Sequence, residues 1–176
     1  MISIYLIRHG LAGDRTNDRD DHLRALTPEG HRKTHGVAKS LRKLGLDLDV
    51  IMSSPLIRAQ ETAQILADTN PSPVAVITTD CLAPDGDPQH NLQLWCAAVR
   101  QNVLPQWDLS ADLAIAVVGH EPDLSAWAEL LVWGAVKGGI VLKKAGVMGL
   151  TLPSTGEWVG NSILFLLVPP KVLLLS

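Results

Sequence analysis

Two arginines and two histidines lie at or just beyond the ends of short apolar runs, and their types suit chemistry on an anion. Arg8 and His9 follow the run 2–7, Arg58 comes soon after the run 49–53, and His120 follows the run 113–118. A guanidinium fork matches phosphoryl oxygens bidentately, and a neutral imidazole can act as a nucleophile. These residue types predict the binding and transfer of a phosphoryl group.

The residues also indicate how the reaction would run. A histidine in a strand-to-loop turn can be held as one tautomer by a hydrogen bond from Nδ1–H, which leaves Nε2 free to attack phosphorus. Attack by His9 in line with the leaving group would give a phosphohistidine intermediate, which water hydrolyses. Arg8, Arg58 and His120 would stabilise charge on the equatorial oxygens.

The elements that must position these residues alternate between strands and helices. The apolar runs predict strands at 2–7, 49–53, 74–79 and 113–118, and apolar periodicity predicts helices at 28–44, 55–69, 88–103 and 122–133. Residues 11–24 are polar and without a period, which indicates a loop. Near the C-terminus, 147–152 and 158–168 flank a turn sequence and predict an antiparallel pair. The expected fold class is α/β, a three-layer αβα sandwich with a mainly parallel sheet and an antiparallel edge.

This fold brings the reactive residues together. Ligands of open α/β sheets bind outside the carboxyl ends of the strands. Arg8-His9-Gly10, Ser53-Ser54-Pro55 with Arg58, and Gly119-His120-Glu121-Pro122 all follow strands. The helices expected after Pro55 and Pro122 would aim free N–H groups at a bound anion.

The motifs resemble those of the histidine phosphatase superfamily, which has a phosphoglycerate mutase-like fold. The matching residues are Arg8-His9-Gly10, Ser54-Pro55 with Arg58 and Thr62, and Gly119-His120. Within the superfamily the chain most resembles the small bacterial phosphohistidine phosphatases of the SixA type. With these it shares the segments Asp21-x-x-Arg24-x-Leu26-Thr27-x-x-Gly30 and Leu82-x-Pro84-x-Gly86-Asp87. The resemblance extends from residue 4 to about residue 130.

The resemblance implies a role for each matching residue. His9 would be the nucleophile, and Arg8, Arg58 and His120 would form the phosphate pocket. The further substrate-binding residues would be Arg24, Ser54 and Gly119.

One departure from the superfamily bears on the substrate. Many members have a glutamate after the third strand as general acid, and residues 80–87 contain none; Asp85 and Asp87 are the candidates to replace it. An imidazole leaving group, with an ordinary pKa of about 6.5, departs more easily than an alkoxide. The missing glutamate therefore favours phosphohistidine over sugar or glycerate phosphates.

The spacing of the elements favours the same substrate. Between Asp80 and Leu113 there is room for one helix and its loops, but not for a lid domain that would enclose a metabolite. We therefore expect a phosphohistidine phosphatase acting on a signalling phosphotransfer protein. The alternatives are a small-molecule phosphomonoesterase or mutase of the same superfamily, and a non-catalytic module that binds phosphorylated partners.

Composition and length bear on the number of domains, the binding partners and the location of the protein. The 176 residues are expected to form one domain, 1–176, and the net charge of −3 argues against general nucleic-acid binding. With no apolar run near the ~20 residues of a membrane span and no leader pattern, we expect a soluble cytoplasmic protein. Since no nucleotide-binding loop or metal motif is present, no cofactor or metal is expected. The apolar tail 172–175 either packs on the core or contacts another subunit.

Overall fold

The computed structural model describes residues 1–14, 21–84, 86–108 and 110–175. It contains a six-stranded sheet with strand order β3-β2-β4-β1-β5-β6. The strands are β1 (Ile2–Arg8), β2 (Val50–Ser53), β3 (Val76–Thr78), β4 (Leu113–Gly119), β5 (Val147–Leu152) and β6 (Ile163–Val168). The first four run parallel, whereas β5 pairs antiparallel with both β1 and β6. The predicted mainly parallel sheet with an antiparallel edge is confirmed.

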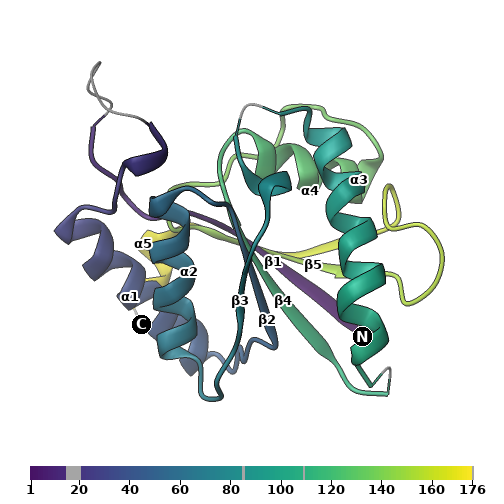
Figure 1. Ribbon diagram of the computed structural model, residues 1–176, viewed down its shortest axis with the longest axis horizontal. Helices are drawn as coiled ribbons and strands as arrows, with labels where there is room; N and C mark the ends of the chain where they lie inside the picture. Colours follow the sequence, from purple (N-terminus) through teal and green to yellow (C-terminus); the bar gives the residue numbers. More distant parts are fainter. Residues whose placement is uncertain (15–20, 85, 109, 176) are drawn as a thin grey trace.

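Helices cover both faces of the sheet (Figure 1). One face carries α1 (Pro28–Lys43), α2 (Ile57–Thr69) and the short α5 (Pro170–Leu173), and the other carries α3 (Pro88–Ala98) and α4 (Asp123–Trp133). Each helix layer packs on the sheet through its own cluster of buried apolar side chains. This arrangement confirms the three-layer αβα sandwich.

Local sequence explains where these elements begin and what they bury. The Thr27 hydroxyl accepts a hydrogen bond from the Gly30 N–H and caps α1, and Pro28 occupies the first turn. Gly45 follows the helix with a φ of 82°, a left-handed conformation that favours glycine. The central strand β4 is buried on both faces, as its continuous apolar run predicted.

Several predicted boundaries are wrong. Helix α2 begins at Ile57 instead of residue 55, because the Leu56 N–H bonds the Ser54 hydroxyl in a preceding turn. Helix α3 is α-helical only to Ala98 and continues as a π turn, Val99–Val103, and a 3-10 turn, Leu104–Gln106. Strand β6 begins at Ile163 instead of 158, because Trp158 to Ser162 form a turn closed by hydrogen bonds to the Trp158 carbonyl.

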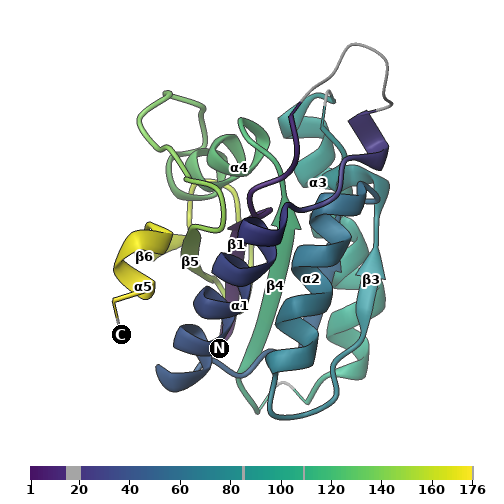
Figure 2. The ribbon, with the colours of Figure 1, turned by 90° about the vertical axis from the view of Figure 1, so that its left-hand side faces the viewer.

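One residue of the apolar tail packs on the core, whereas Val172, Leu174 and Leu175 are exposed. Leu173 of α5 is buried in the same cluster as α1 and α2, and its carbonyl accepts a hydrogen bond from the Ser40 hydroxyl at 2.6 Å. Figure 2 shows α5 beside α1 at the β6 edge of the sheet. No helix within the described residues is long and apolar enough to cross a membrane.

The start of α1 lies tightly against the segment that follows His9. The Thr27 N–H donates to the Leu11 carbonyl at 2.9 Å, and a Cβ at Gly30 would collide with that same carbonyl oxygen. This backbone oxygen cannot move aside as a flexible side chain can. The glycine at position 30 is therefore required by close approach of two backbone segments.

We predict that Gly30→Ala lowers the free energy of unfolding by about 1–3 kcal/mol, the usual cost of overpacking. This is the opposite of the ordinary effect in a helix, where alanine is more favourable than glycine. Urea unfolding followed by circular dichroism measures the change. Gly36→Ala is the matched control in the same helix, because its Cβ would meet only the flexible end of Leu174. Equal or greater stability of Gly30→Ala than of the wild type would contradict the prediction.

Candidate active site

The carboxyl ends of β1 and β4 and the first turn of α2 surround one cavity of about 290 Å³. The structure brings together there all four residues that the sequence singled out, namely Arg8, His9, Arg58 and His120. The cavity is also lined by Arg24, Pro84, Glu121, Pro122 and Lys144. Positive side chains therefore predominate around it.

Backbone and side-chain bonds hold His9 in one orientation. Its backbone N–H donates to the Gly119 carbonyl at 3.1 Å, which ties the end of β1 to the end of β4. Its Nδ1 lies 2.7 Å from the Gly10 carbonyl oxygen, and a carbonyl can only accept, so Nδ1 carries the hydrogen. The lone pair of the neutral ring is then on Nε2. The side chain is 6% exposed.

Arg58 donates a hydrogen bond to this lone pair, and Asp21 in turn accepts hydrogen bonds from Arg58. The Arg58 Nε–H donates to His9 Nε2 at 3.3 Å. Its Nη1 and Nη2 donate to the backbone carbonyl and the carboxylate of Asp21 at 2.8 and 2.9 Å. The other oxygen of this carboxylate lies 2.8 Å from Arg24 Nε. Asp21 thus bridges two arginines of the cavity, and it does so from a one-turn 3-10 helix, Asp21–Leu23, in the segment predicted to be a loop.

His120 is oriented by Ser54. The Ser54 hydroxyl oxygen accepts from the Leu56 N–H and lies 2.8 Å from His120 Nε2. In the tautomer in which this hydroxyl donates to Nε2, the neutral ring carries its own hydrogen on Nδ1. Nδ1 is buried and has no hydrogen-bond partner among the described residues. Ser54, predicted to bind substrate, is bonded to this histidine.

Arg8 offers a second donor without a partner. Its Nη1 donates to the Leu142 carbonyl at 3.0 Å, whereas its buried Nε has no partner in the part of the chain that the structure describes. Buried donors are nearly always paired, and an unpaired one costs about 1–3 kcal/mol. Arg8 Nε and His120 Nδ1 belong to residues that line the cavity, so an anion with several oxygens fits them.

The loop that supplies the Leu142 carbonyl and Lys144 is anchored by Glu129. This buried carboxylate of α4 accepts hydrogen bonds from four successive backbone N–H groups, those of residues 137–140. Burial acts to raise the pKa of Glu129, but the four donors outweigh it and the net shift is downward. Farther along, the Ala145 N–H donates to the carbonyls of Arg8 and His9 at 3.0 and 3.2 Å. The loop is thereby fixed to the end of β1.

Both histidines are held neutral. Burial is the largest cause that lowers the pKa of His9 to about 3; Arg58, Arg8 and Lys144 lower it further, and the bond to Gly10 opposes them. Burial also lowers the pKa of His120 to about 3, with His9 and the two arginines adding to the effect. Protonation of His120 near neutral pH is therefore disfavoured. Neutral His9 is the form with a free electron pair for attack.

Two of the remaining predicted residues, Asp87 and Gly119, do not line the cavity. Asp87 caps α3 by accepting from the Gln89 N–H at 2.9 Å and is not among the described residues that line the cavity. Asp85 lies outside the described residues. Gly119 ends β4, where an added Cβ would come within 3.2 Å of the Leu124 side chain, and it is not among the described residues that line the cavity. The sequence reasoning missed Asp21, Glu121 and Lys144. Asp21 had a signal, since it lies three residues before Arg24 in a shared motif.

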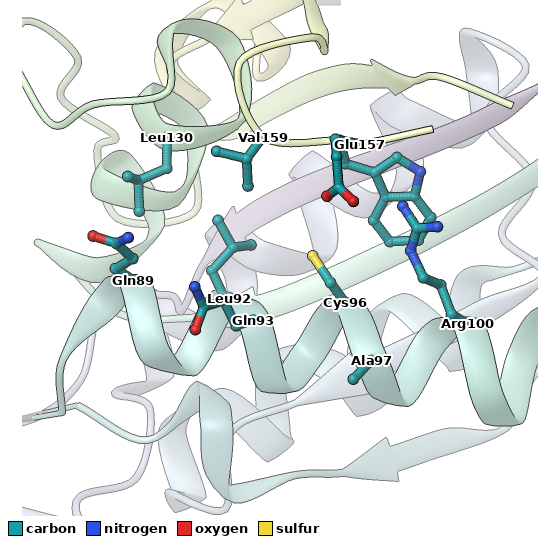
Figure 3. Close-up of a pocket in the computed structure, with 10 residues that line it drawn as sticks. Gln89, Leu92, Gln93, Cys96, Ala97, Arg100, Leu130, Glu157 and Val159 are labelled. Atoms are coloured by element: carbon teal, nitrogen blue, oxygen red, sulfur yellow. The ribbon is translucent and has the colours of Figure 1, made fainter. Parts of the chain in front are cut away.

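A second cavity of about 360 Å³ lies between α3 and residues 157–159 (Figure 3). Leu92 and Cys96 point into it from α3, and the Arg100 guanidinium lies 4.2 Å from the centre of the Trp158 ring. Burial raises the pKa of Cys96 to about 12, so its thiol is protonated and a poor nucleophile. None of the sequence-predicted catalytic residues lines this cavity.

Comparison with known proteins agrees with the resemblance to the histidine phosphatase superfamily. The family model described as histidine phosphatase superfamily (branch 1) matches residues 4–83. A relative from Picosynechococcus sp., an uncharacterized protein, is 37% identical over 174 residues, covering 98% of this chain and 99% of its own. The chain belongs to the histidine phosphatase superfamily.

Solved structures of this superfamily share the whole fold. The protein histidine phosphatase SixA, in a structure complexed with tungstate, superposes with a TM-score of 0.78 at 20% identity, covering 97% of this chain and 99% of SixA. A phosphoserine phosphatase from Entamoeba histolytica, in complex with phosphoserine, superposes with a TM-score of 0.68 at 18% identity, covering 97% and 98% of the two chains. At these identities the likeness concerns the fold, which is phosphoglycerate mutase-like.

We predict that Asp21→Asn lowers kcat/KM of this histidine phosphatase for a phosphomonoester by about 10- to 100-fold, equivalent to about 1.4–2.7 kcal/mol. Loss of the charge removes the bridge that holds Arg58 and Arg24 toward the cavity. Steady-state kinetics measures the effect, and Asp112→Asn, whose carboxylate pairs with the N-terminal amine, is the control. An unchanged kcat/KM would show that the arginines do not need the bridge.

We also predict that the His9 and His120 rings do not titrate between about pH 8 and pH 5 in the folded, anion-free protein, because their pKa values lie well below the usual ~6.5. Below pH ~6.5 the two histidines bind protons in the unfolded chain but stay neutral in the folded protein. The free energy of unfolding therefore falls as pH drops toward 3. Histidine NMR resonances and urea unfolding at a series of pH values check the two statements. A ring resonance of His9 with a midpoint near 6.5 would refute the first.

Proposed function

We propose that this chain is a phosphatase that removes the phosphoryl group from phosphohistidine of a signalling phosphotransfer protein, through a covalent phospho-His9 intermediate. The observation that carries the proposal is the environment of His9 Nε2. Its tautomer is fixed by Gly10, and its lone pair faces a donor, Arg58 Nε, beside a cavity lined by cationic side chains.

The reaction follows from the donors around the cavity. The phosphoryl oxygens accept from Arg8 Nε, His120 Nδ1 and the Arg58 guanidinium, and engagement of Arg58 by an oxygen frees the lone pair of His9. Nε2 then forms a bond to phosphorus while the bond to the leaving group breaks and its electron pair departs with that group. A water molecule next attacks phospho-His9, the N–P bond breaks, and inorganic phosphate leaves.

The positive charge required by this reaction comes from the chain itself. Arg8, Arg24 and Arg58 line the cavity with Lys144, and together they match the charge of a phosphoryl group in the transition state. We propose on this ground that hydrolysis needs no metal ion.

The surroundings of the cavity support a protein-borne substrate. Between β3 and α3 the described residues form only a single 3-10 turn, Asp80–Leu82, and short connections, and they supply no domain that would close over the pocket. A phosphorylated side chain projecting from a partner can enter such a site. SixA, with which the chain shares its fold, is named a protein histidine phosphatase.

The test follows loss of phosphate from a phosphohistidine-bearing phosphotransfer domain with a chelator present. We predict that His9→Ala lowers the rate at least about a thousandfold, because the nucleophile is lost. His35→Ala, a histidine of α1 that lines neither described cavity, is the matched control and retains the wild-type rate.

Three outcomes would contradict parts of the proposal. Wild-type turnover of sugar, nucleotide or glycerate phosphates far above that of phosphohistidine would point to a small-molecule phosphatase. Tight phosphate binding without turnover of any substrate would point to a phospho-binding module. Activity abolished by the chelator and restored by a divalent cation would refute metal independence.

A further inference from the structure

Glu121 is the one carboxyl group among the described residues that line the phosphate cavity. Phosphoryl transfer to His9 gains from a proton donor to the leaving group, and hydrolysis of phospho-His9 gains from a base that takes a proton from water. Asp87, predicted for that role, is engaged as the cap of α3. The position of Glu121 therefore answers a chemical requirement that the other lining residues leave open.

The structure holds this carboxyl group in place. Glu121 directly follows His120, and its Oε1 accepts a hydrogen bond from the Ser125 hydroxyl at 2.8 Å. Ser125 is buried in the first turns of α4, so one side of the carboxyl group is fixed by a rigid element. The group is partly buried and faces a cavity otherwise lined by cations, imidazoles and prolines.

The electrostatic environment suits a carboxyl group that changes protonation during a reaction. Burial is the largest influence and raises the pKa of Glu121, with Asp123 adding to it. The Ser125 hydroxyl and the Arg8 guanidinium act in the opposite direction, and the net shift is upward. The other titratable or charged residues that line the same cavity are His9, His120, Arg8, Arg24, Arg58 and Lys144.

We propose that Glu121 is the acid–base residue of this pocket, an inference that rests on the proposed function in requiring His9 as nucleophile. In the first step the His9 Nε2–phosphorus bond forms and the bond to the leaving atom breaks. The electron pair stays on the leaving atom, which takes the proton of the Glu121 carboxyl group and departs neutral. For a phosphohistidine substrate the departing species is neutral imidazole.

The second step returns Glu121 to its protonated form. A water oxygen forms a bond to phosphorus, and the Glu121 carboxylate takes a proton from that water. The N–P bond of phospho-His9 breaks, and its electron pair returns to Nε2. Inorganic phosphate leaves with Glu121 again protonated, so both steps balance in atoms and charge.

Two aryl phosphates separate these steps in rapid-quench kinetics of Glu121→Gln. The 4-nitrophenolate of 4-nitrophenyl phosphate departs without protonation, whereas the phenolate of phenyl phosphate is a much poorer leaving group. With the nitrophenyl ester the variant gives a burst of one nitrophenolate per active site, accumulates phospho-His9, and then turns over about 100-fold more slowly than wild type. With phenyl phosphate the burst disappears because the first step is also slowed.

Glu157→Gln is the matched control, since it makes the same change at the second cavity, and it keeps wild-type kinetics on both esters. Ser125→Ala is an independent second variant. It removes a donor that stabilises the carboxylate, so the pKa of Glu121 rises further and the alkaline limb of the phenyl phosphate rate moves to higher pH.

Wild-type rates without a burst in Glu121→Gln, or an unmoved alkaline limb in Ser125→Ala, would overturn the proposal. The aryl esters report on Glu121 whatever the natural substrate is. The wild-type protein could therefore turn over both esters normally and still fail to hydrolyse phosphohistidine. That result would contradict the proposed function but not the role of Glu121. An inactive Glu157→Gln would show that the loss in Glu121→Gln is not specific to this pocket, which would also overturn the inference.

Discussion

The parallel pairing of β1 with β4 is the constraint on which the site depends. Ile2 pairs with Leu113 and the register runs unbroken to Arg8 and Gly119, after which His9 and His120 leave the sheet side by side. Their ring centroids lie 5.1 Å apart. A slip of one residue would move the side chains of one strand from one apolar cluster to the other, so close packing of the two clusters fixes the register. The core therefore sets the spacing of the histidines.

The second constraint is the concentration of positive charge around the cavity. Arg58 is 3% exposed, and a buried charge needs a partner. Asp21 supplies it for Arg58 and Arg24, and the Leu142 carbonyl accepts from Arg8. The histidines respond differently, because they can lose their protons and remain neutral. The guanidinium groups are thus kept charged and in position, while the imidazoles keep an electron pair.

Sequence patterns predicted the parts of this arrangement that depend on local periodicity. The apolar runs of β1 and β4 and the Thr27-Pro28 start of α1 follow from short-range chemistry, and with them the sheet edge at which the reactive residues gather. The interactions of Asp21 with Arg58 and of Glu129 with residues 137–140 could not be predicted in this way. Asp21 and Arg58 are 37 residues apart, and the four N–H groups on Glu129 come from backbone, which has no sequence signature. The boundary of β6 was wrong for a different reason. Gly160-Asn161 is a turn signal, and the prediction extended the strand across it because apolar residues lie on both sides.

The hydrogen bond from Arg58 Nε to His9 Nε2 bears on which molecules can react with the nucleophile. While this donor is engaged, the electron pair of the nucleophile is not available to a passing electrophile. A neutral alkylating or acylating reagent has no charged acceptor for the guanidinium. An anionic phosphoryl group has a charged oxygen that replaces the imidazole as acceptor. Arg58 thus engages the electron pair of the nucleophile, and a negatively charged oxygen is the kind of acceptor that can take the place of the imidazole.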